Sequence, residues 1–333
     1  MPRIINESYL RRFNNPSLAE VFATYGKLSG NLLEDKQMVD EMNVLMEQDD
    51  DFDPFGHLVK KEKISPKDDC VLSFSRGNDK LQHLDVVYVS LPAGYSCPFA
   101  KACKSMAHKY GGKFKDTGKS IKDFGDIRCY AASTELYAPA ARRLRWRNFH
   151  LLQEFKGDPE GMADLIKRSL DFYESENHPI RLFRIHESGD FFSMDYFDAW
   201  ILAAKQRPEI LFYAYTKSLP LWKERKDVIP KNLRLIASEG GTHDHLIDKE
   251  QFRKSIIVKD KGEAIEKRLN IDINDFLAAF GDEDFALLLH GVQNKEGGMT
   301  AQAQANSKIL KSAAKKFHSS PVEVERLLRR YTE

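Results

Sequence analysis

Three of the four cysteines, Cys97, Cys103 and Cys129, lie in one stretch that is rich in glycine and lysine. The stretch follows a predicted β-strand at residues 84–91 (LDVVYVSL). Thiolates on one loop at the end of one strand can converge on a single inorganic centre, and thiolates are the usual protein ligands of iron–sulfur clusters. The spacing therefore predicts that residues 92–132 form a loop that binds a metal or an iron–sulfur cluster.

The spacing favours a 4Fe–4S cluster over structural zinc. Zinc sites prefer cysteine pairs separated by about two to four residues and four closed ligands, whereas this chain has C-x5-C and no clear second pair. Two alternatives stay open: a nucleophilic thiol activated by the local positive charge, and three buried, unreactive cysteines. A fourth ligand could come from Cys70 or His108, from His186 or an aspartate, or the fourth iron could stay open to a small ligand.

Short apolar strands alternate with helices from residue 70 onward. Strands are predicted at residues 70–75, 84–91, 181–186, 210–215, 233–238, 255–259 and 285–290. Helices are predicted at residues 139–155, 160–174, 194–206, 220–228, 261–268, 300–316 and 321–331. This alternation implies parallel pairing with right-handed crossovers. We expect an α/β fold, a partial (β/α)6 TIM-like barrel at residues 66–333, preceded by a helical appendage with an acidic linker at residues 1–65.

Polar residues follow several predicted strands at their carboxyl ends, where the active sites of parallel α/β folds gather. The positions singled out are His186, Ser188, Gly189, Asp190, Tyr215, Thr216 and Lys217. Their repetition at one topological point favours a partial barrel with a shared site over a doubly wound sheet. His186, Asp190 and Lys217 are the candidates for catalysis. Taken singly, Asp190 can also be a helix cap, and His186 can also be a core histidine.

Bulk composition excludes some classes of protein. The formal net charge is +1, which gives no global steering toward nucleic acid or anionic membranes. No apolar stretch approaches the roughly 20 residues that span a bilayer, and the N-terminus lacks a secretory signal, so we expect a cytoplasmic location. Locally, residues 101–128 carry eight Lys or Arg against three Asp, and four arginines follow at positions 142, 143, 145 and 147.

Several longer motifs match a known family. They are SLPAGYSCPFAKAC, RCYAASTE, WRNFHLL, RIHESGDFFSMDYFDAW, LFYAYTKSLPLW and ALLLHG. Over about residues 70–292 the chain resembles the gene-88 protein family of bacteriophages. The resemblance implies a virus-encoded protein of the host cell cytoplasm with an iron–sulfur cluster in a truncated barrel. It also implies Cys97, Cys103 and Cys129 as ligands, with Ser188, Gly189, Tyr215 and Thr216 among the binding residues.

The expected architecture is also similar to that of radical S-adenosylmethionine enzymes. Those enzymes use C-x3-C-x2-C, which this chain lacks, so S-adenosylmethionine as a cofactor rests on fold analogy alone. The leading hypothesis is a 4Fe–4S protein with a redox role: electron transfer, sensing, or a reductive reaction that involves an unidentified redox partner or small molecule. The alternative is a zinc-stabilised phage protein that binds or processes nucleic acid. The sequence leaves open whether the protein is an enzyme.

Overall fold

The computed structural model describes residues 71–76, 81, 84–110, 113–116, 129–290, 299–316 and 321–332, together with Lys36. The predicted N-terminal appendage lies outside the described residues apart from Lys36. Cys70 and residues 117–128 of the basic stretch lie outside them as well. Within the described residues, no helix is long and apolar enough to cross a membrane.

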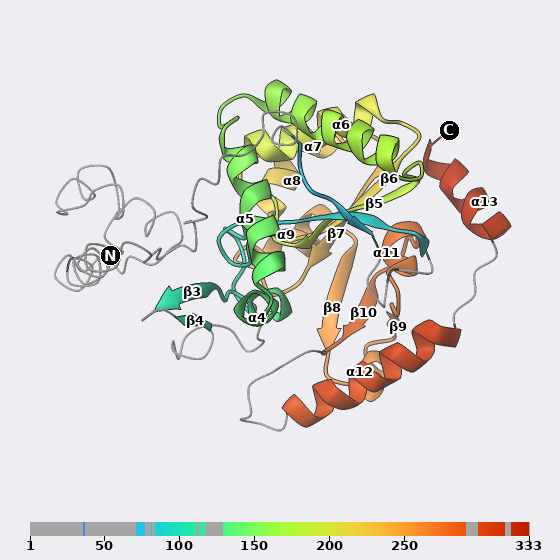
Figure 1. The fold of residues 1–333 in the computed structure, drawn as a ribbon. Coiled ribbons are helices and arrows are strands. Elements are labelled where there is room, and N and C mark those ends of the chain that lie inside the picture. Colours follow the sequence, from blue (N-terminus) through green and yellow to red (C-terminus); the bar gives the residue numbers. More distant parts are fainter. Residues whose placement is uncertain are drawn as a thin grey trace.

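The described residues contain an open, mixed sheet of eight strands (Figure 1). In spatial order these are β1 (Ser75–Arg76), β2 (Val87–Ser90), β5 (Leu182–Ser188), β6 (Leu211–Thr216), β7 (Leu233–Ser238), β8 (Lys254–Val258), β10 (Phe285–Leu288) and β9 (Asn270–Ile271). The pairs from β2 to β9 are parallel, and β1 is antiparallel to β2. Because β1 and β9 form free edges in the described part, the sheet does not close into a TIM-like barrel.

Helices connect and cover the strands. Their bounds are α4 Tyr130–Tyr137, α5 Pro139–Gln153, α6 Pro159–Glu176, α7 Met194–Gln206, α8 Leu219–Arg225, α9 His245–Glu250, α10 Lys261–Glu266, α11 Phe276–Phe280, α12 Met299–Lys316 and α13 Pro321–Thr332. A short 3₁₀ helix, Lys226–Val228, follows α8, and a small hairpin of β3 (Ala107–Tyr110) and β4 (Lys113–Asp116) extends from the cysteine loop. The α/β class expected from the sequence is therefore confirmed.

The two faces of the sheet bury separate apolar clusters. Successive strand side chains point to opposite faces. Phe183 and Phe212, which are paired in register, therefore pack with Trp200 of α7 and with residues of α5 and α6. Leu182 and Leu211, the preceding pair, lie in the other cluster with residues of α11 and α13. Figure 1 shows α6 and α7 side by side on one side of the sheet.

The sequence predicted some elements closely and missed others. The observed bounds of β7 and α7 coincide with the predicted ranges, and Ser193 caps α7 by accepting a hydrogen bond from the N–H of Tyr196. The strand predicted at residues 70–75 is shorter, with only Ser75–Arg76 paired. The β3–β4 hairpin and helices α4, α9 and α11 were not predicted. Of these, α4 matters most, because it begins inside the predicted cysteine loop.

Candidate functional site

The three cysteines gather at the carboxyl edge of the sheet. Cys97 and Cys103 lie in the loop after β2, and Cys129 is the residue that precedes α4. All three are free thiols with partly accessible side chains. Burial is the main cause that raises the pKa of Cys97 well above its usual value, and the Asp190 carboxyl and the other two thiols raise it further. The three thiols are therefore within electrostatic reach of one another, although a long stretch of sequence separates Cys129 from the other two.

Cys129 lies at the start of a helix. Burial, followed by the neighbouring Cys103, raises the pKa of Cys129 to about 12. Backbone hydrogen bonds at Ala131 and Ala132, in the first turn of α4, act in the opposite direction. Because N–H groups at a helix start favour negative charge, they would favour a thiolate once a cation draws the proton away. Without such a cation the raised pKa values favour the neutral thiols, and metal binding would release protons.

Backbone pairing fixes the cysteine loop to two strand ends. The N–H of Leu91 donates to the carbonyl oxygen of Ser188 at 2.8 Å, which holds the loop to the end of β5. The N–H groups of Lys101 and Ala102 donate to the carbonyl oxygen of Gly240 at 3.0 and 2.8 Å. A β-bridge between residues 100 and 241 adds to this attachment. The loop is thus held across β5 and β7 near their carboxyl ends.

Two glycines allow this close approach. Gly189 has φ +96°, and a Cβ there would lie 2.6 Å from Ser96 Oγ and 2.7 Å from Leu91 Cβ. Gly240 has φ +97°, and a Cβ there would lie 2.8 Å from the Cβ of Ala102. Both the left-handed backbone and the lack of space require glycine at these positions. Gly189, predicted as a binding residue, therefore allows the cysteine loop to pack closely against the end of β5.

Asp190 lies near Cys97, and Lys217 lies near Asp190. The Asp190 carboxylate accepts hydrogen bonds from Thr216 Oγ1 at 2.6 Å and from the backbone N–H groups of Phe191 and Lys217, both at 2.8 Å. Burial nevertheless raises the pKa of Asp190. The Lys217 ammonium donates to Ser238 Oγ at 2.6 Å and to the Ser238 carbonyl oxygen at 3.2 Å. The Lys217 side chain therefore lies beside the turn at Gly240 and Gly241, which the cysteine loop contacts.

The other predicted binding residues separate into two groups. Ser188 Oγ donates to the carbonyl oxygen of Leu91 at 2.7 Å, so Ser188 belongs to the attachment of the loop. Tyr215 lies elsewhere, because its hydroxyl bonds Asp272 and Asp275, and the Arg184 guanidinium lies over its ring, 4.9 Å from the centroid. The structure therefore brings Ser188, but not Tyr215, to the cysteine loop.

His186 points away from the cysteine loop. Its Nε2 lies 3.0 Å from the hydroxyl of Tyr196 in α7, and its ring packs edge-on against Phe191. Burial, assisted by the charge of Arg184, lowers the pKa of His186 to about 3, so the ring is neutral near pH 7. Its backbone has φ +71°, which is rare outside glycine. The structure thus places His186 in the core under α7, the alternative that the sequence left open for this residue.

A buried ionic group beside the cysteines was not predicted. Arg145 of α5 bonds Glu135 of α4 at 2.9 Å and Glu187 of β5 at 3.1 Å, and Tyr130 donates to the Glu187 carbonyl oxygen. The sequence showed only a run of four arginines, which is typical of a solvated surface. No local pattern could have shown the pair, because Glu135 belongs to α4 and Arg145 to α5.

Two more of the four arginines also bond inward. Arg142 donates to the Glu135 carbonyl oxygen, and Arg147 donates to the Val71 carbonyl oxygen at 2.8 Å and to Ser73 Oγ at 3.0 Å. Arg145 is only 4% exposed, whereas Arg143 is exposed. Three of the four arginines behind the nucleic-acid hypothesis are therefore engaged within the protein.

The candidates for a fourth ligand gain no support from the described residues. Cys70 lies outside them, and His108 is described only as a backbone position in β3. Among the described residues, no group of three or more His, Cys, Asp or Glu side chains is arranged to hold a single metal ion. The thiols raise one another's pKa, but they are not arranged as the ligands of one metal ion.

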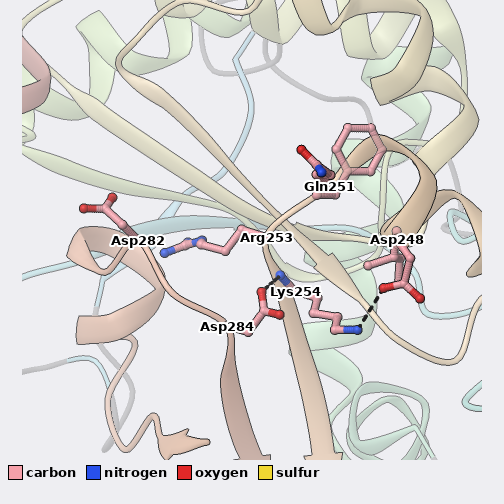
Figure 2. Close-up of a pocket in the computed structure, with 8 residues that line it drawn as sticks. Asp248, Gln251, Arg253, Lys254, Asp282 and Asp284 are labelled. Carbon is pink, nitrogen blue, oxygen red and sulfur yellow. Dashed lines mark hydrogen bonds and ion pairs between the residues drawn. The ribbon is translucent and has the colours of Figure 1, made fainter.

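A cavity of about 350 Å³ lies at the opposite end of the sheet, where β8 begins (Figure 2). Its charged groups are paired with one another or with backbone. Lys254 bonds the Asp284 carboxylate through its N–H at 2.8 Å and Asp248 through its ammonium at 3.2 Å. Arg253 donates to carbonyl oxygens at the end of α11. This cavity holds none of the predicted site residues.

Fold and site together define a class: a mixed α/β protein with a long loop after its first parallel strand that gathers three thiols at the carboxyl edge. Within this class, the chain belongs to the "Gene product 88" family, whose model matches residues 71–312. The family predicted from the sequence motifs is confirmed.

Two curated relatives come from bacteriophages. The chain is 30% identical over 91 residues to the "Gene 88 protein" of Mycobacterium phage L5, and 33% identical over 95 residues to that of Mycobacterium phage D29. Each alignment covers 27% of this chain and 38% of the relative, so the chain spans less than half the length of these proteins. No solved structure matches the chain. The relatives support the predicted bacteriophage origin.

Proposed function

We propose that this protein binds one 4Fe–4S cluster through Cys97, Cys103 and Cys129 and uses it in a redox role. The observation that carries the proposal is the approach of Cys129 to the loop that carries Cys97 and Cys103: its N–H donates to Ser105 Oγ at 3.3 Å, two residues from Cys103, and all three thiols are free. Thiolates are the ligands that iron–sulfur clusters require. When bound, the cluster would supply one-electron chemistry at the carboxyl edge of the sheet.

The surroundings fit a negatively charged cluster. Backbone hydrogen bonds at Gly94 and at the start of α4 favour thiolates on Cys97 and Cys129. Lys104 lies close enough that Cys97 raises its pKa, although burial lowers that pKa overall. Lys104 is thus a cation that would offset the charge that deprotonated thiols and a cluster would bring.

The spacing of the cysteines favours a cluster over one metal ion. Ligands of a single zinc ion all lie about 2.3 Å from the same centre, so their sulfurs must almost touch. A cubane cluster binds each thiolate at a different iron, so its ligands stand farther apart. The C-x5-C spacing of Cys97 and Cys103 is wider than the pairs that zinc prefers, which supports the second arrangement. Three thiolates would leave one iron for a small ligand.

The strand order supports the finer fold proposal, a partial (β/α)6 barrel. The strands β2, β5, β6, β7, β8 and β10 follow one another in the sheet in chain order, so the sheet is wound in one direction. A doubly wound sheet would reverse its order at a switch point. A curved sheet of this kind would bring all six carboxyl ends around the cysteine loop.

Serine substitutions test the proposal. Anaerobically reconstituted protein should be brown, with thiolate-to-iron absorption near about 400 nm. We expect the Cys97→Ser, Cys103→Ser and Cys129→Ser variants to lose most of this absorption while they stay folded by circular dichroism. Cys70→Ser is the matched control and should keep it. Colourless wild-type protein, or three serine variants as brown as the wild type, would refute the cluster.

A further inference from the structure

Helix α4 carries the third thiol, and its first turn is held from several sides. The N–H of Cys129 donates to Ser105 Oγ at 3.3 Å, which links it to the loop that carries Cys103. The Tyr130 hydroxyl donates to the carbonyl oxygen of Glu187 at the end of β5. These contacts join three segments that are distant in sequence.

Arg145 and its partner Glu135 make the other contacts that hold α4 in place. Arg145 Nη1 donates to the carbonyl oxygen of Ala131 at 3.0 Å and to Glu135 Oε1 at 2.9 Å, so it bonds α4 in both its first and second turns. Its Nη2 bonds Glu187 Oε2 at 3.1 Å. Glu135 Oε1 also accepts a hydrogen bond from the N–H of Ala93, in the loop that carries Cys97, at 3.0 Å.

The group is deeply buried. Glu135 is fully buried and Arg145 is 4% exposed. Removing the arginine would therefore leave two carboxylates without their cation, one of them inside the protein. Burial opposes the charge of Arg145, yet Glu187 and Glu135 keep its pKa raised. The ion pairs of Arg145 with Glu135 and Glu187 are therefore held within the protein.

The backbone of β5 is distorted in a way that brings Glu187 to this group. His186 has φ +71°, and the register between β2 and β5 shifts at this point. In a regular strand His186 would share a face with Arg184, and Glu187 would point to the opposite face. The bulge instead turns His186 into the core under α7, while Glu187 reaches Arg145. Bulges commonly redirect a side chain beside a functional site.

We infer that Arg145, with Glu135 and Glu187, forms a positioning group that sets the place of Cys129 relative to Cys97 and Cys103. Arg145 joins α4 to β5, and Glu135 joins α4 to the loop before Cys97. None of the three touches the thiols through a bond of its own. This inference rests on the proposed function for its purpose, but the spacing of the thiols can be measured without iron.

The test uses the metal-free full-length chain with the Cys70→Ser and Cys97→Ser substitutions, which leave Cys103 and Cys129 as one pair. Dibromobimane becomes fluorescent when it joins two nearby thiols. Because the thiolate is the reacting form, cross-linking in this background should be slow and should speed up as pH rises, and Arg145→Met should lower its rate at a fixed pH by at least about tenfold. Arg207→Met is the matched control, because Arg207 is also a buried arginine bound to carboxylates, Glu174 and Asp171 among them.

Glu187→Gln provides a milder variant if Arg145→Met does not fold, and it should slow cross-linking by a smaller factor. Equal rates in the background and in every folded Arg145 or Glu187 variant would overturn the inference. Iron separates the two proposals. If cross-linking depends on Arg145 but wild-type protein takes up no iron, the positioning group stands and the cluster fails. If wild-type protein takes up iron and the folded Arg145→Met protein takes up as much with unchanged cross-linking, the positioning group fails.

Discussion

The two ends of the sheet are built on different principles. At the carboxyl end, Cys97, Cys129 and Asp190 have pKa values raised by burial, and His186 has a lowered one. At the amino end, burial lowers the pKa of Arg253 to about 10, but most other charges are paired near the surface, as in Arg181 with Glu325 at 3.0 Å. Perturbed groups that lie together mark functional sites, whereas paired surface charges and apolar packing serve solubility and stability.

Helix α13 covers the amino end of the sheet. Of the substitutions considered, one in the buried face of α13 should lower the free energy of unfolding most. Leu328 is 3% exposed and packs in the cluster beneath the sheet. Leu328→Ala should lower the free energy of unfolding by about 2–5 kcal/mol, measured by urea denaturation. Iron bound per folded chain should stay unchanged. A loss of iron from the folded variant would break the proposed separation between the two ends.

Gly189→Ala tests the carboxyl end. The substitution should lower the free energy of unfolding by about 1–3 kcal/mol. Residue 189 has a left-handed backbone, and the new Cβ would also have to displace Ser96 and Leu91. Gly157→Ala is the matched control: φ there is +84°, but a Cβ would meet nothing within 4 Å. The control should therefore cost only about 1 kcal/mol of backbone strain. Equal costs would show that the loop does not press on β5.

His186 should make stability depend on pH. Its folded pKa of about 3 lies below the unfolded value of about 6.5, so the unfolded state binds one more proton between these values. The histidine therefore contributes a loss of about 2 kcal/mol as pH falls from about 6.5 to 5. His186→Asn, which tolerates positive φ, should remove this slope. Identical pH dependence in both proteins would place a charged or exposed histidine there.

Asp248→Asn should have the smallest effect. Asp248 pairs with Lys254 beside the cavity in Figure 2, but its side chain is 88% exposed. Exposed ion pairs contribute little because water and salt screen them, so stability should change by less than about 0.5 kcal/mol. Urea denaturation at low and high salt measures this. A change above about 1 kcal/mol would mean that the amino end depends on its charges more than on its packing.

The sequence predicted the frame of the molecule better than its site. Apolar runs and helical spacing located β7 and α7 at their observed bounds, because burial on two faces and on one face leaves clear patterns. The short helix α4 was missed, since the cysteine and glycine composition around it indicated a loop. Its position depends on tertiary contacts with Arg145 and the strand ends.

Within the site, the sequence located the residues whose position follows from the order of strands and helices. It missed the residues whose side-chain direction depends on the bulge in β5. The three cysteines were found because they follow one strand and precede one helix. His186 and Glu187 could not be assigned, because regular alternation puts them on the faces opposite to those observed. The left-handed backbone of His186 changes the face to which both side chains point, and no local sequence pattern predicts such a residue.

The content of iron and acid-labile sulfide per chain, measured on anaerobic protein, tests the central claim most directly. A 4Fe–4S cluster on three cysteines predicts about four iron and four sulfide, with a paramagnetic signal after one-electron reduction. Zinc in place of iron, or iron without sulfide, would contradict it.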